Sequence, residues 1–540
     1  MDQSSHPVAS VVRPDVLDRL TFLGWRRSLV AILAGLALSF VLFGYAVVYW
    51  RNADMDFMVI YSALAMNAGK PQQYLDHTAY LTILSVKSWF SLLHGLGLLN
   101  PWTLPAMPKA ADATAFDTAM TQAVRAGRVL AFAIAIGSVT IFAGLSRVIL
   151  RDWRVALLAT LAFALSGGVA VHSRILRSEL VAAMPVIFAL MLLIAIGRRA
   201  HVARPLGMAL ASSLCILGLE NKVQAILMIG VLPFLILPFG SPQGASVAFW
   251  RTRAAWLAAP IAAVVAVGAA WAAWPIMSAG FDRSLLDAAQ FRPLLLNQFG
   301  VYQAALLVLI GACMIAYAAI WRVSAAETLT SIFAVATAAC LTLLLLDVNY
   351  NAGNAIAVAN PLEKMLTFAD ATTSNAAGSS SPLAAIVLLL DGLASVLARY
   401  TFVLHSSPRP AVFLIWLIVP GIVHAWRRGE RLAALQALVL MLAALAIDTL
   451  DVRRGLKAEY FIFTDPMIVV AGAILLDSLR DLRFHKWAYP IAATLFVLHV
   501  AVGQAEPIKN AFRRTGPESI CEWSGSYMPL MPLPWCPTRS

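Results

Sequence analysis

The sequence that decides the fold is LVAILAGLALSFVLFGYAVVY, residues 29–49, which lies just after the pair Arg26 and Arg27. It is long enough to cross a bilayer, because a spanning helix needs about 20 mostly apolar residues. The polar segment before it, residues 1–28, lacks the short apolar core of a cleavable signal peptide. We therefore expect a retained first membrane helix with the two arginines on its cytoplasmic side.

The composition agrees with a chain that meets lipid over most of its length. Of its 540 residues, 60% are hydrophobic and 13% are charged, and the mean hydropathy is +0.78. A soluble domain carries about a quarter charged residues. The net charge of +12 does not indicate a nucleic-acid partner, because much of the basic charge lies in short clusters between apolar runs, as membrane topology requires.

About thirteen segments qualify as spanning helices by length and apolar character, so we predict an all-α polytopic membrane protein. They cover residues 29–49, 129–150, 155–171, 180–196, 206–219, 223–239, 255–277, 301–321, 328–346, 412–426, 432–447, 462–479 and 487–503. The expected bundle occupies residues 1–505 and includes long outer loops at 50–128 and 347–411. Residues 506–540 are expected to form a short outward-facing tail.

The short connections on one side of this arrangement are all basic, whereas those on the other side are longer and richer in Asp, Asn, Ser and Pro. Cytoplasmic loops carry the excess of Lys and Arg, which places the N-terminus in the cytoplasm and the C-terminal tail outside. The Ala- and Arg-rich composition suits a bacterial inner membrane, with the tail in the periplasm. There, Cys521 and Cys536 are expected to form a disulfide; the alternative is two unpaired thiols.

Two amphipathic helices are expected in the outer loops. In residues 383–404, Asp391, Ser395 and Arg399 recur at intervals of four and leave an apolar opposite face, which is typical of a helix at a membrane interface. Counting this segment as a span would also invert every later basic loop. Residues 78–98 show a similar pattern, with Lys87, Ser91 and His94 on the polar side.

The first outer loop opens with Asp54 and Asp56, directly after the first membrane helix. Asp56 starts a helical pattern, where an aspartate can serve simply as an N-cap. At a membrane boundary the same carboxylate can instead accept the proton of a hydroxyl that attacks an anomeric carbon. Two carboxylates two positions apart also suit a divalent cation, so these two residues are the candidate metal ligands if a metal binds.

This loop resembles the first outer loop of the GT-C glycosyltransferases. It is most similar to the branch that uses polyprenyl-phosphate sugars, such as polyprenol-phosphate-mannose-dependent mannosyltransferases and related arabinofuranosyltransferases. The residues that carry the resemblance are Asp56, Phe57, Tyr61, Ala63, Gly69 and Tyr74. Elsewhere only the order of helices and loops agrees. The resemblance implies a GT-C-like bundle in which Asp56 is the catalytic base, Asp54 supports it, and Tyr61, Tyr74 and His77 lie near the substrate.

The segment HSRILRSE, residues 172–179, supplies candidate ligands for a donor phosphate. Arg174 and Arg177 are three positions apart and share a helical face, and a guanidinium binds a phosphate through two parallel hydrogen bonds. His172 and Glu179 are expected beside the substrate. The alternative is that the arginines only extend from a helix end towards the membrane surface. In GT-C enzymes a comparable loop helps to shape the active site.

A second charged group, Glu220 and Lys222, lies between two short apolar runs. Ionisable residues at membrane depth are costly, so they usually pair or serve a function. We expect Lys222 to reach the donor phosphate, and Glu220 to pair with it or to contact the substrate. A plain turn at the interface is the alternative.

The expected function is that of an inverting glycosyltransferase, which moves a sugar from a polyprenyl-phosphate donor to a hydroxyl of a cell-envelope glycan or glycolipid. No organic cofactor is expected. A transporter or flippase is one alternative, but the sequence has no two halves that align and its charges lie at the outer boundary. A glycan ligase or polymerase with a lipid-diphosphate donor is a second alternative, since it needs the same basic outer loops.

Overall fold

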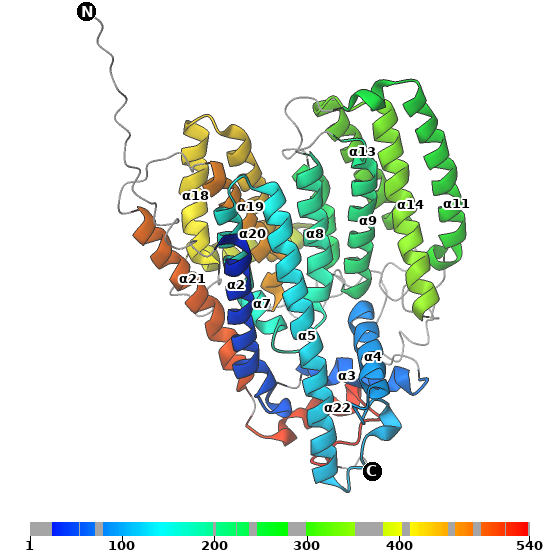
Figure 1. Ribbon diagram of the computed structural model, residues 1–540, viewed down its shortest axis with the longest axis vertical. Coiled ribbons are helices and arrows are strands. Elements are labelled where there is room, and N and C mark those ends of the chain that lie inside the picture. The colour runs from blue at the N-terminus through cyan, green and yellow to red at the C-terminus, as the bar shows by residue number, and fades with distance from the viewer. Residues whose placement is uncertain are drawn as a thin grey trace, which may run out of the picture.

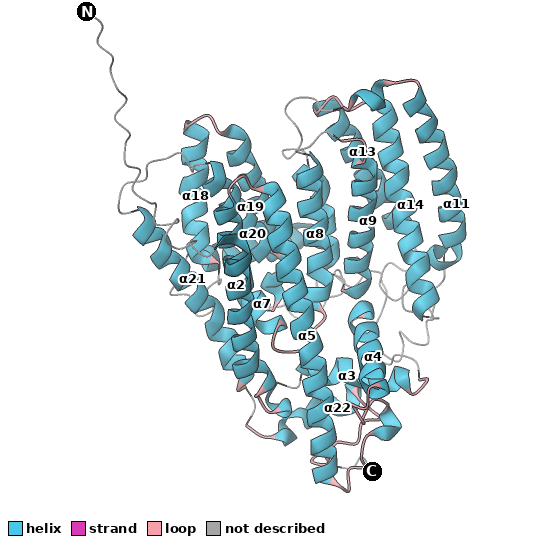
Figure 2. Ribbon diagram, viewed as in Figure 1, coloured by secondary structure: helices cyan, strands magenta, loops and turns pink. Residues whose placement is uncertain are grey.

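The computed structural model of the chain describes residues 24–52, 54–70, 79–197, 201–222, 224–236, 246–278, 299–350, 382–401, 411–451, 459–478, 488–513 and 515–537. Regular structure within these ranges is helical, and they contain no strand (Figure 2). The all-α prediction is therefore confirmed for the described part of the chain.

Most of the long helices run side by side along the long axis of the molecule (Figure 1). The helices of the bundle are α2 (Gly24–Phe40), α5 (Ala113–Ile149), α8 (Glu179–Gly197), α9 (Arg204–Asn221), α10 (Ala225–Ile236), α11 (Ala258–Ser278), α13 (Phe299–Ile320), α14 (Ala325–Tyr350), α18 (Val412–Arg427), α19 (Arg431–Asp451), α20 (Asp465–Ser478) and α21 (Ala488–Ala511). Helices α9, α11 and α14 pack together on one side, whereas α18, α19 and α20 pack together on the other.

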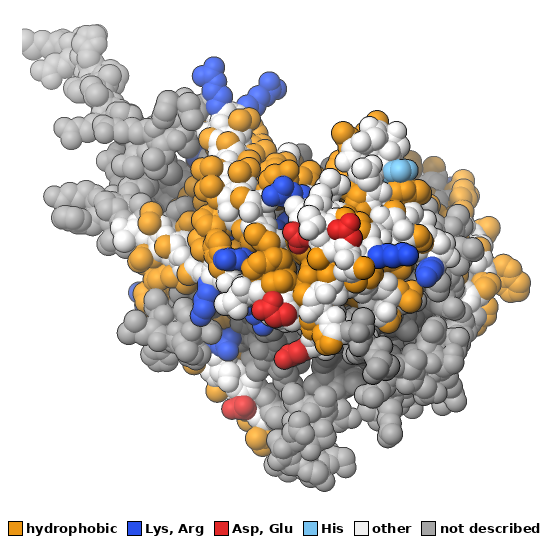
Figure 3. Space-filling view, turned by 90° about the horizontal axis from the view of Figure 1, so that it is seen from below, with side chains coloured by type: hydrophobic (Ala, Val, Ile, Leu, Met, Phe, Trp, Pro, Cys, Tyr) orange, Lys and Arg blue, Asp and Glu red, His pale blue; other side chains and the backbone are white. Residues whose placement is uncertain are grey.

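Three shorter helices gather at one end of the bundle, the lower end in Figure 1: α3 (Asp54–Asn67), α4 (Tyr80–Gly95) and α22 (Cys521–Tyr527). We call this the α3 end. In Figure 3, which looks at the molecule from this end, apolar side chains cover much of the described surface, with charged side chains of both signs scattered among them.

Six helical segments in the described part are long and apolar enough to cross a membrane, which is consistent with an integral membrane protein. They are Gly24–Tyr45, Ala113–Ile149, Glu179–Gly197, Ala254–Ile276, Ala325–Leu346 and Arg431–Thr449. A described helix overlaps each of the thirteen expected spans, but several of these helices are too short to qualify. The number thirteen therefore remains a prediction.

One expected span, residues 155–171, is two helices instead of one. Helix α6 (Trp153–Ala164) ends before Ser166, and α7 (Gly167–His172) begins after it. The Ser166 hydroxyl accepts a hydrogen bond from the N–H of Val169 at 3.3 Å, which is the usual N-cap arrangement. Gly168 then passes so close to Ile462 that a Cβ would lie 2.9 Å from the Ile462 nitrogen. The break thus positions His172 on a short separate helix.

Helix α5 is much longer than the expected span at 129–150, because it begins at Ala113, inside the segment predicted as outer loop. Asp112 precedes it and accepts a hydrogen bond from the N–H of Ala115 at 2.9 Å, so its side chain caps the helix. The added turns carry the helix to the α3 end (Figure 1). They also place Arg128 in the middle of a helix and not at the start of one.

Both expected amphipathic segments are helices in the structure. Helix α17 (Pro382–Thr401) is not among the six candidate spans, and it buries Val396 and Tyr400 while Asp391 is exposed. Helix α4 buries Ile83, Val86 and Phe90 in the apolar cluster that also contains residues of α3 and α5. The apolar side of α4 therefore packs against protein.

The C-terminal tail folds back over the α3 end. The expected boundary at residue 505 falls inside α21, which continues to Ala511. Beyond it, Cys521 and Cys536 form the expected disulfide. Buried tail residues on both sides of α22 join the same apolar cluster as Phe57 of α3: Ile520, Met528, Met531 and Leu533.

Candidate functional site

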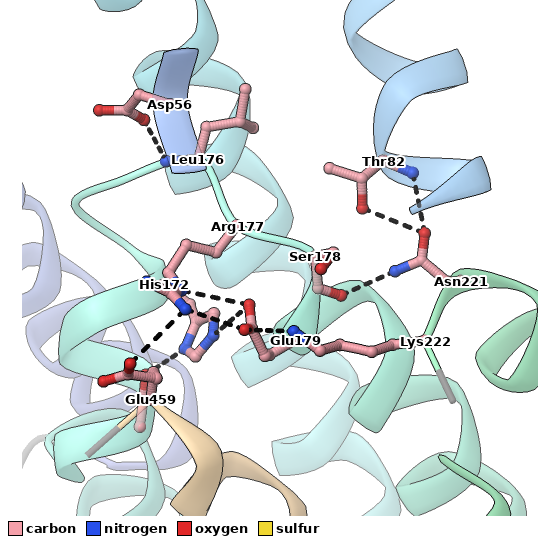
Figure 4. A network of polar contacts seen from close by, with 11 residues as sticks. Asp56, Thr82, His172, Leu176, Arg177, Ser178, Glu179, Asn221, Lys222 and Glu459 are labelled. Carbon is pink, nitrogen blue, oxygen red and sulfur yellow. Dashed lines mark hydrogen bonds and ion pairs between the residues drawn. The ribbon is translucent and has the colours of Figure 1, made fainter. Parts of the chain in front are cut away.

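Asp56 lies in the first turn of α3, and its side chain is fully buried. Its Oδ1 accepts a hydrogen bond from the backbone N–H of Leu176 at 2.6 Å (Figure 4). Its Oδ2 accepts one from Nε of Arg128 at 2.9 Å and lies 2.9 Å from Nη2 of the same guanidinium. Because α3 begins at Asp54 and these partners belong to other segments, Asp56 is not acting as an N-cap.

Arg128 was not singled out from the sequence, yet it is the main partner of Asp56. It is 1% exposed, and its Nη1 donates to the carbonyl oxygens of Gly44 and Val47 at 2.9 and 2.8 Å. It therefore ties the end of the first membrane helix to α3 and α5. The one available signal was an arginine at the start of an apolar run, which also occurs at ordinary helix ends.

The environment of Asp56 affects its proton affinity in two directions. Burial raises the pKa of this carboxyl above the usual aspartate range, while the charge of Arg128 and the N–H of Leu176 oppose the rise. A raised pKa makes a carboxylate a stronger proton acceptor. Both oxygens already accept hydrogen bonds from the protein, so a substrate hydroxyl gains close access only when one of these contacts lengthens.

A second charged cluster centres on Glu179, the first residue of α8 (Figure 4). Arg177 holds both of its oxygens, with Nη2 at 3.0 Å and Nε at 3.2 Å. Nζ of Lys222 donates a short hydrogen bond to Oε1. Arg177 also lies 3.6 Å from the carboxylate of Glu459. Two of the three cations that were expected to bind phosphate, Arg177 and Lys222, therefore already have carboxylate partners.

His172 completes this cluster from the end of α7. Its Nδ1 lies 2.6 Å from the carbonyl oxygen of Gly168. A carbonyl oxygen only accepts hydrogen bonds, so Nδ1 carries a proton in this arrangement. The other ring nitrogen, Nε2, faces Oε2 of Glu179 at 3.5 Å.

Asn221 joins the cluster to α4. Its Nδ2 donates to the carbonyl oxygen of Ser178 at 2.7 Å, and its Oδ1 accepts hydrogen bonds from the backbone N–H and the hydroxyl of Thr82, both at 3.1 Å. The residues 173–178 are thus fixed from several sides by side chains that the sequence places far apart.

Arg174 has a different environment from Arg177. Its guanidinium is 3% exposed, and its partners are neutral: the hydroxyl of Ser39 at 2.7 and 3.1 Å and the amide oxygen of Gln504 at 2.6 Å. The guanidinium also stacks over the ring of Phe43 at 5.0 Å, while Nη1 has no hydrogen-bond partner. Burial lowers the pKa of Arg174 to about 10, so it stays charged at neutral pH.

A small cleft lies beside this arginine. It measures about 460 Å³ including its open mouth, and its polar lining consists of Asn52, Arg174, Arg177, Glu459, Asn510 and Arg513. Residues from the turn that follows α2, the 173–178 segment and the end of α21 therefore meet around a space lined by three arginines and one glutamate. Asp56 does not itself line the cleft, but it accepts a hydrogen bond from the backbone of Leu176, two residues from Arg174.

The remaining expected residues do not all belong to this site. Tyr61 is buried, and its hydroxyl accepts the N–H of Leu530 in the tail at 3.4 Å. Glu220 is 6% exposed, and burial raises its pKa to about 8. Tyr74 and His77 lie outside the described residues, and the side chain of Asp54 is not described either. The described part contains no group of three His, Cys, Asp or Glu side chains placed to hold a metal.

Comparison with known proteins adds no relative. No protein-family model, no curated protein and no solved structure gives a significant match to the chain. The resemblance to the GT-C enzymes therefore rests on residues 56–74 alone and stays a prediction.

Proposed function

We propose that the chain is an inverting glycosyltransferase that moves a sugar from a polyprenyl-phosphate donor to an acceptor hydroxyl at the outer face of the membrane. The observation that carries the proposal is the environment of the Arg174 guanidinium. This buried cation has only neutral partners, it keeps one free donor nitrogen, and it lines a cleft. A buried charge without a counter-ion is costly, and an anionic ligand would supply the missing partner.

The chemistry of the reaction fits such a cleft. The acceptor oxygen forms a bond to the anomeric carbon, the bond from that carbon to the phosphate oxygen breaks, and the lipid phosphate leaves with the electron pair. Donors aimed at the developing negative charge stabilise this departure. Arg174 provides a guanidinium, and Arg513 and Asn510 add a second cation and an amide at the same cleft.

In this proposal Asp56 is the base that receives the acceptor proton. Burial raises its pKa, and its bond to Leu176 connects it to the 173–178 segment, whose Arg174 and Arg177 line the cleft. The segment has to shift slightly for the acceptor to reach the carboxylate. Arg128 then keeps the carboxylate oriented through its Nε and Nη2 contacts.

A second candidate is a ligase or polymerase that uses a lipid-diphosphate donor. It is favoured by the presence of more than one guanidinium at the cleft, since Arg174, Arg177 and Arg513 all line it. Arg177, however, is shared with two carboxylates, which leaves less positive charge than a diphosphate would need.

The test is to incubate the purified protein with labelled polyprenyl-phosphate and polyprenyl-diphosphate sugars, with and without a chelator. Release of free polyprenyl phosphate, together with a glycosylated acceptor, is expected. Arg174→Gln should weaken donor binding by about 10- to 100-fold, because a hydrogen bond to a charged group contributes about 1.5–3 kcal/mol. Arg428→Gln is the matched control, since Arg428 is exposed after α18 and lies outside the cleft.

Two results would contradict the proposal. The first is the absence of lipid-phosphate release from every donor tested. The second is a donor affinity in Arg174→Gln equal to that of Arg428→Gln. Release of lipid diphosphate alone would favour the second candidate.

A further inference from the structure

Three buried polar side chains beside the Glu179 cluster lack partners in the described part of the chain. Gln224 is 2% exposed, and neither its amide oxygen nor its amide nitrogen has a hydrogen-bond partner. The hydroxyl of Ser178, which is fully buried, has none either. Glu220 is 6% exposed, and burial alone, without a contribution from a charge or a hydrogen bond, raises its pKa. The cleft at Arg174 does not include any of the three.

Contacts of neighbouring residues bring these three side chains into one region. Ser178 directly precedes Glu179, and both Glu220 and Gln224 lie two positions from Lys222. Lys222 binds Glu179, and Asn221 donates to the carbonyl oxygen of Ser178 (Figure 4). Helices α8 and α10, which begin just after Ser178 and Gln224, also pack against each other.

Unpaired buried polar groups require a physical reason. Most buried polar atoms in proteins are hydrogen-bonded, and an unmade hydrogen bond carries the full cost of removing the group from water. An apolar side chain of the same size would avoid that cost at position 224. A group that arrives with a ligand would supply the missing hydrogen bonds.

The chemistry of the unpaired groups selects the kind of ligand. An amide, a hydroxyl and a carboxyl offer both donors and acceptors, which is the pattern that sugar hydroxyls match. The neighbouring charges do not select an anion, because Glu179 already pairs with both Arg177 and Lys222. The neighbourhood therefore differs from the cleft at Arg174, where the buried cation has neutral partners.

We infer that Ser178, Glu220 and Gln224 form a subsite that binds the hydroxyl groups of the sugar ring carried by the donor. The inference rests on the proposed function and deepens it. Arg177 connects the two places, since it lines the phosphate cleft and also binds Glu179. The phosphate then occupies the cleft, and the sugar extends along the ion pairs towards Lys222.

The test compares two probes, polyprenyl phosphate without a sugar and polyprenyl-phosphate sugars such as the mannose and arabinofuranose forms. Binding to the purified full-length protein is followed by intrinsic tryptophan fluorescence. The wild type should bind at least one sugar-bearing probe more tightly than the bare lipid phosphate. Gln224→Met should weaken binding of that probe by about 5- to 10-fold, the loss expected for one or two hydrogen bonds, and leave the bare phosphate unaffected.

The melting temperatures of the variants show whether a loss of binding comes from a lost contact or from a destabilised fold. Gln224→Met removes an unpaired buried amide, so its melting temperature should equal or exceed that of the wild type. Ser178→Ala provides a second, smaller variant that should also weaken only the sugar-bearing probe. Its matched control is Ser28→Ala, because the Ser28 hydroxyl is another buried group without a partner, on α2, which carries none of the three subsite residues.

The outcomes are distinct. Failure of the wild type to bind even the bare lipid phosphate would overturn the proposed function. Two other results would overturn only the sugar subsite, provided that the wild type binds the bare lipid phosphate. In the first, no sugar-bearing probe binds more tightly than the bare phosphate. In the second, both Gln224→Met and Ser178→Ala keep the full preference for the sugar-bearing probe. If these variants instead lower the affinity for the acceptor and not for the donor, the subsite belongs to the acceptor and the inference as stated is wrong.

Discussion

Replacing Asp56 with asparagine affects two properties that the structure allows us to separate. Asparagine keeps an oxygen for the N–H of Leu176 but removes the charge that compensates Arg128, which is 1% exposed. An uncompensated buried charge costs about 3–5 kcal/mol. The unfolding entropy is about 2.1 cal/mol/K per residue, or about 1.1 kcal/mol/K for the 540 residues. The melting temperature should therefore fall by about 3–4 °C.

The double variant Asp56→Asn/Arg128→Gln removes both charges at once. Glutamine keeps an amide donor for the carbonyl of Gly44 or Val47, though not for both as Arg128 does. We expect the double variant to regain at least half of the lost stability, as measured by differential scanning fluorimetry in detergent. Sugar transfer, measured with the same preparations, should stay absent in both variants if Asp56 is the base.

The pair of variants can refute either part of the reasoning. A double variant that regains both stability and transfer would show that Asp56 serves only to neutralise Arg128. A double variant as unstable as the single one would show that charge compensation is not what stabilises this region.

Three further predictions concern stability. Because the folded pKa of Glu220 is about 8 against an ordinary 4.5, folding retains a proton that the unfolded chain releases, and stability falls as the pH rises through this range. From pH 6 to pH 8.5 the free energy of unfolding of the wild type should fall by about 2.5 kcal/mol relative to Glu220→Gln, which lowers its melting temperature by about 2 °C. The same dependence of melting temperature on pH in both proteins would contradict this. Reducing the bond between Cys521 and Cys536, which are 15 residues apart, should make local opening of the tail about 3 kcal/mol easier, measured as faster amide hydrogen exchange in α22; unchanged exchange would contradict it. Arg177→Gln should lower the melting temperature because it removes a guanidinium from two carboxylates. Arg174→Gln should leave the melting temperature equal or higher, because Arg174 has only neutral partners. An equal fall in melting temperature in both variants would contradict this difference in pairing.

Much of the helical architecture could be predicted because it depends on local sequence. Apolar runs of the right length coincide with helices, and the tail cysteines pair as expected. The errors arise where local rules compete. Residues 113–128 mix polar and small residues, so they read as a loop, although α5 continues through them. Residues 155–171 are apolar enough to predict one continuous helix, but Ser166 caps the start of a second helix within them.

The pairing of site residues could not be predicted, because it depends on how distant segments meet. Asp56 and Arg128 are 72 positions apart, and Glu179 and Lys222 are 43 apart. The sequence suggested that Lys222 would pair with its neighbour Glu220, whereas the structure gives it Glu179. Arg174 and Arg177 looked equivalent on one helical face, and only the positions of Glu179 and Glu459 distinguish them.

The contact between Tyr61 and Leu530 has a consequence for how the protein is made. It joins residues 469 positions apart, so α3 emerges from the ribosome long before the segment that covers it. During that interval the apolar face around Phe57 lacks the tail residues that bury it in the finished protein. Maturation of this region then waits for the late arrival of residues 515–537 and for the oxidation of their two cysteines. A bulky fusion placed near this segment would interfere with biogenesis even though it lies far from Asp56 in the sequence.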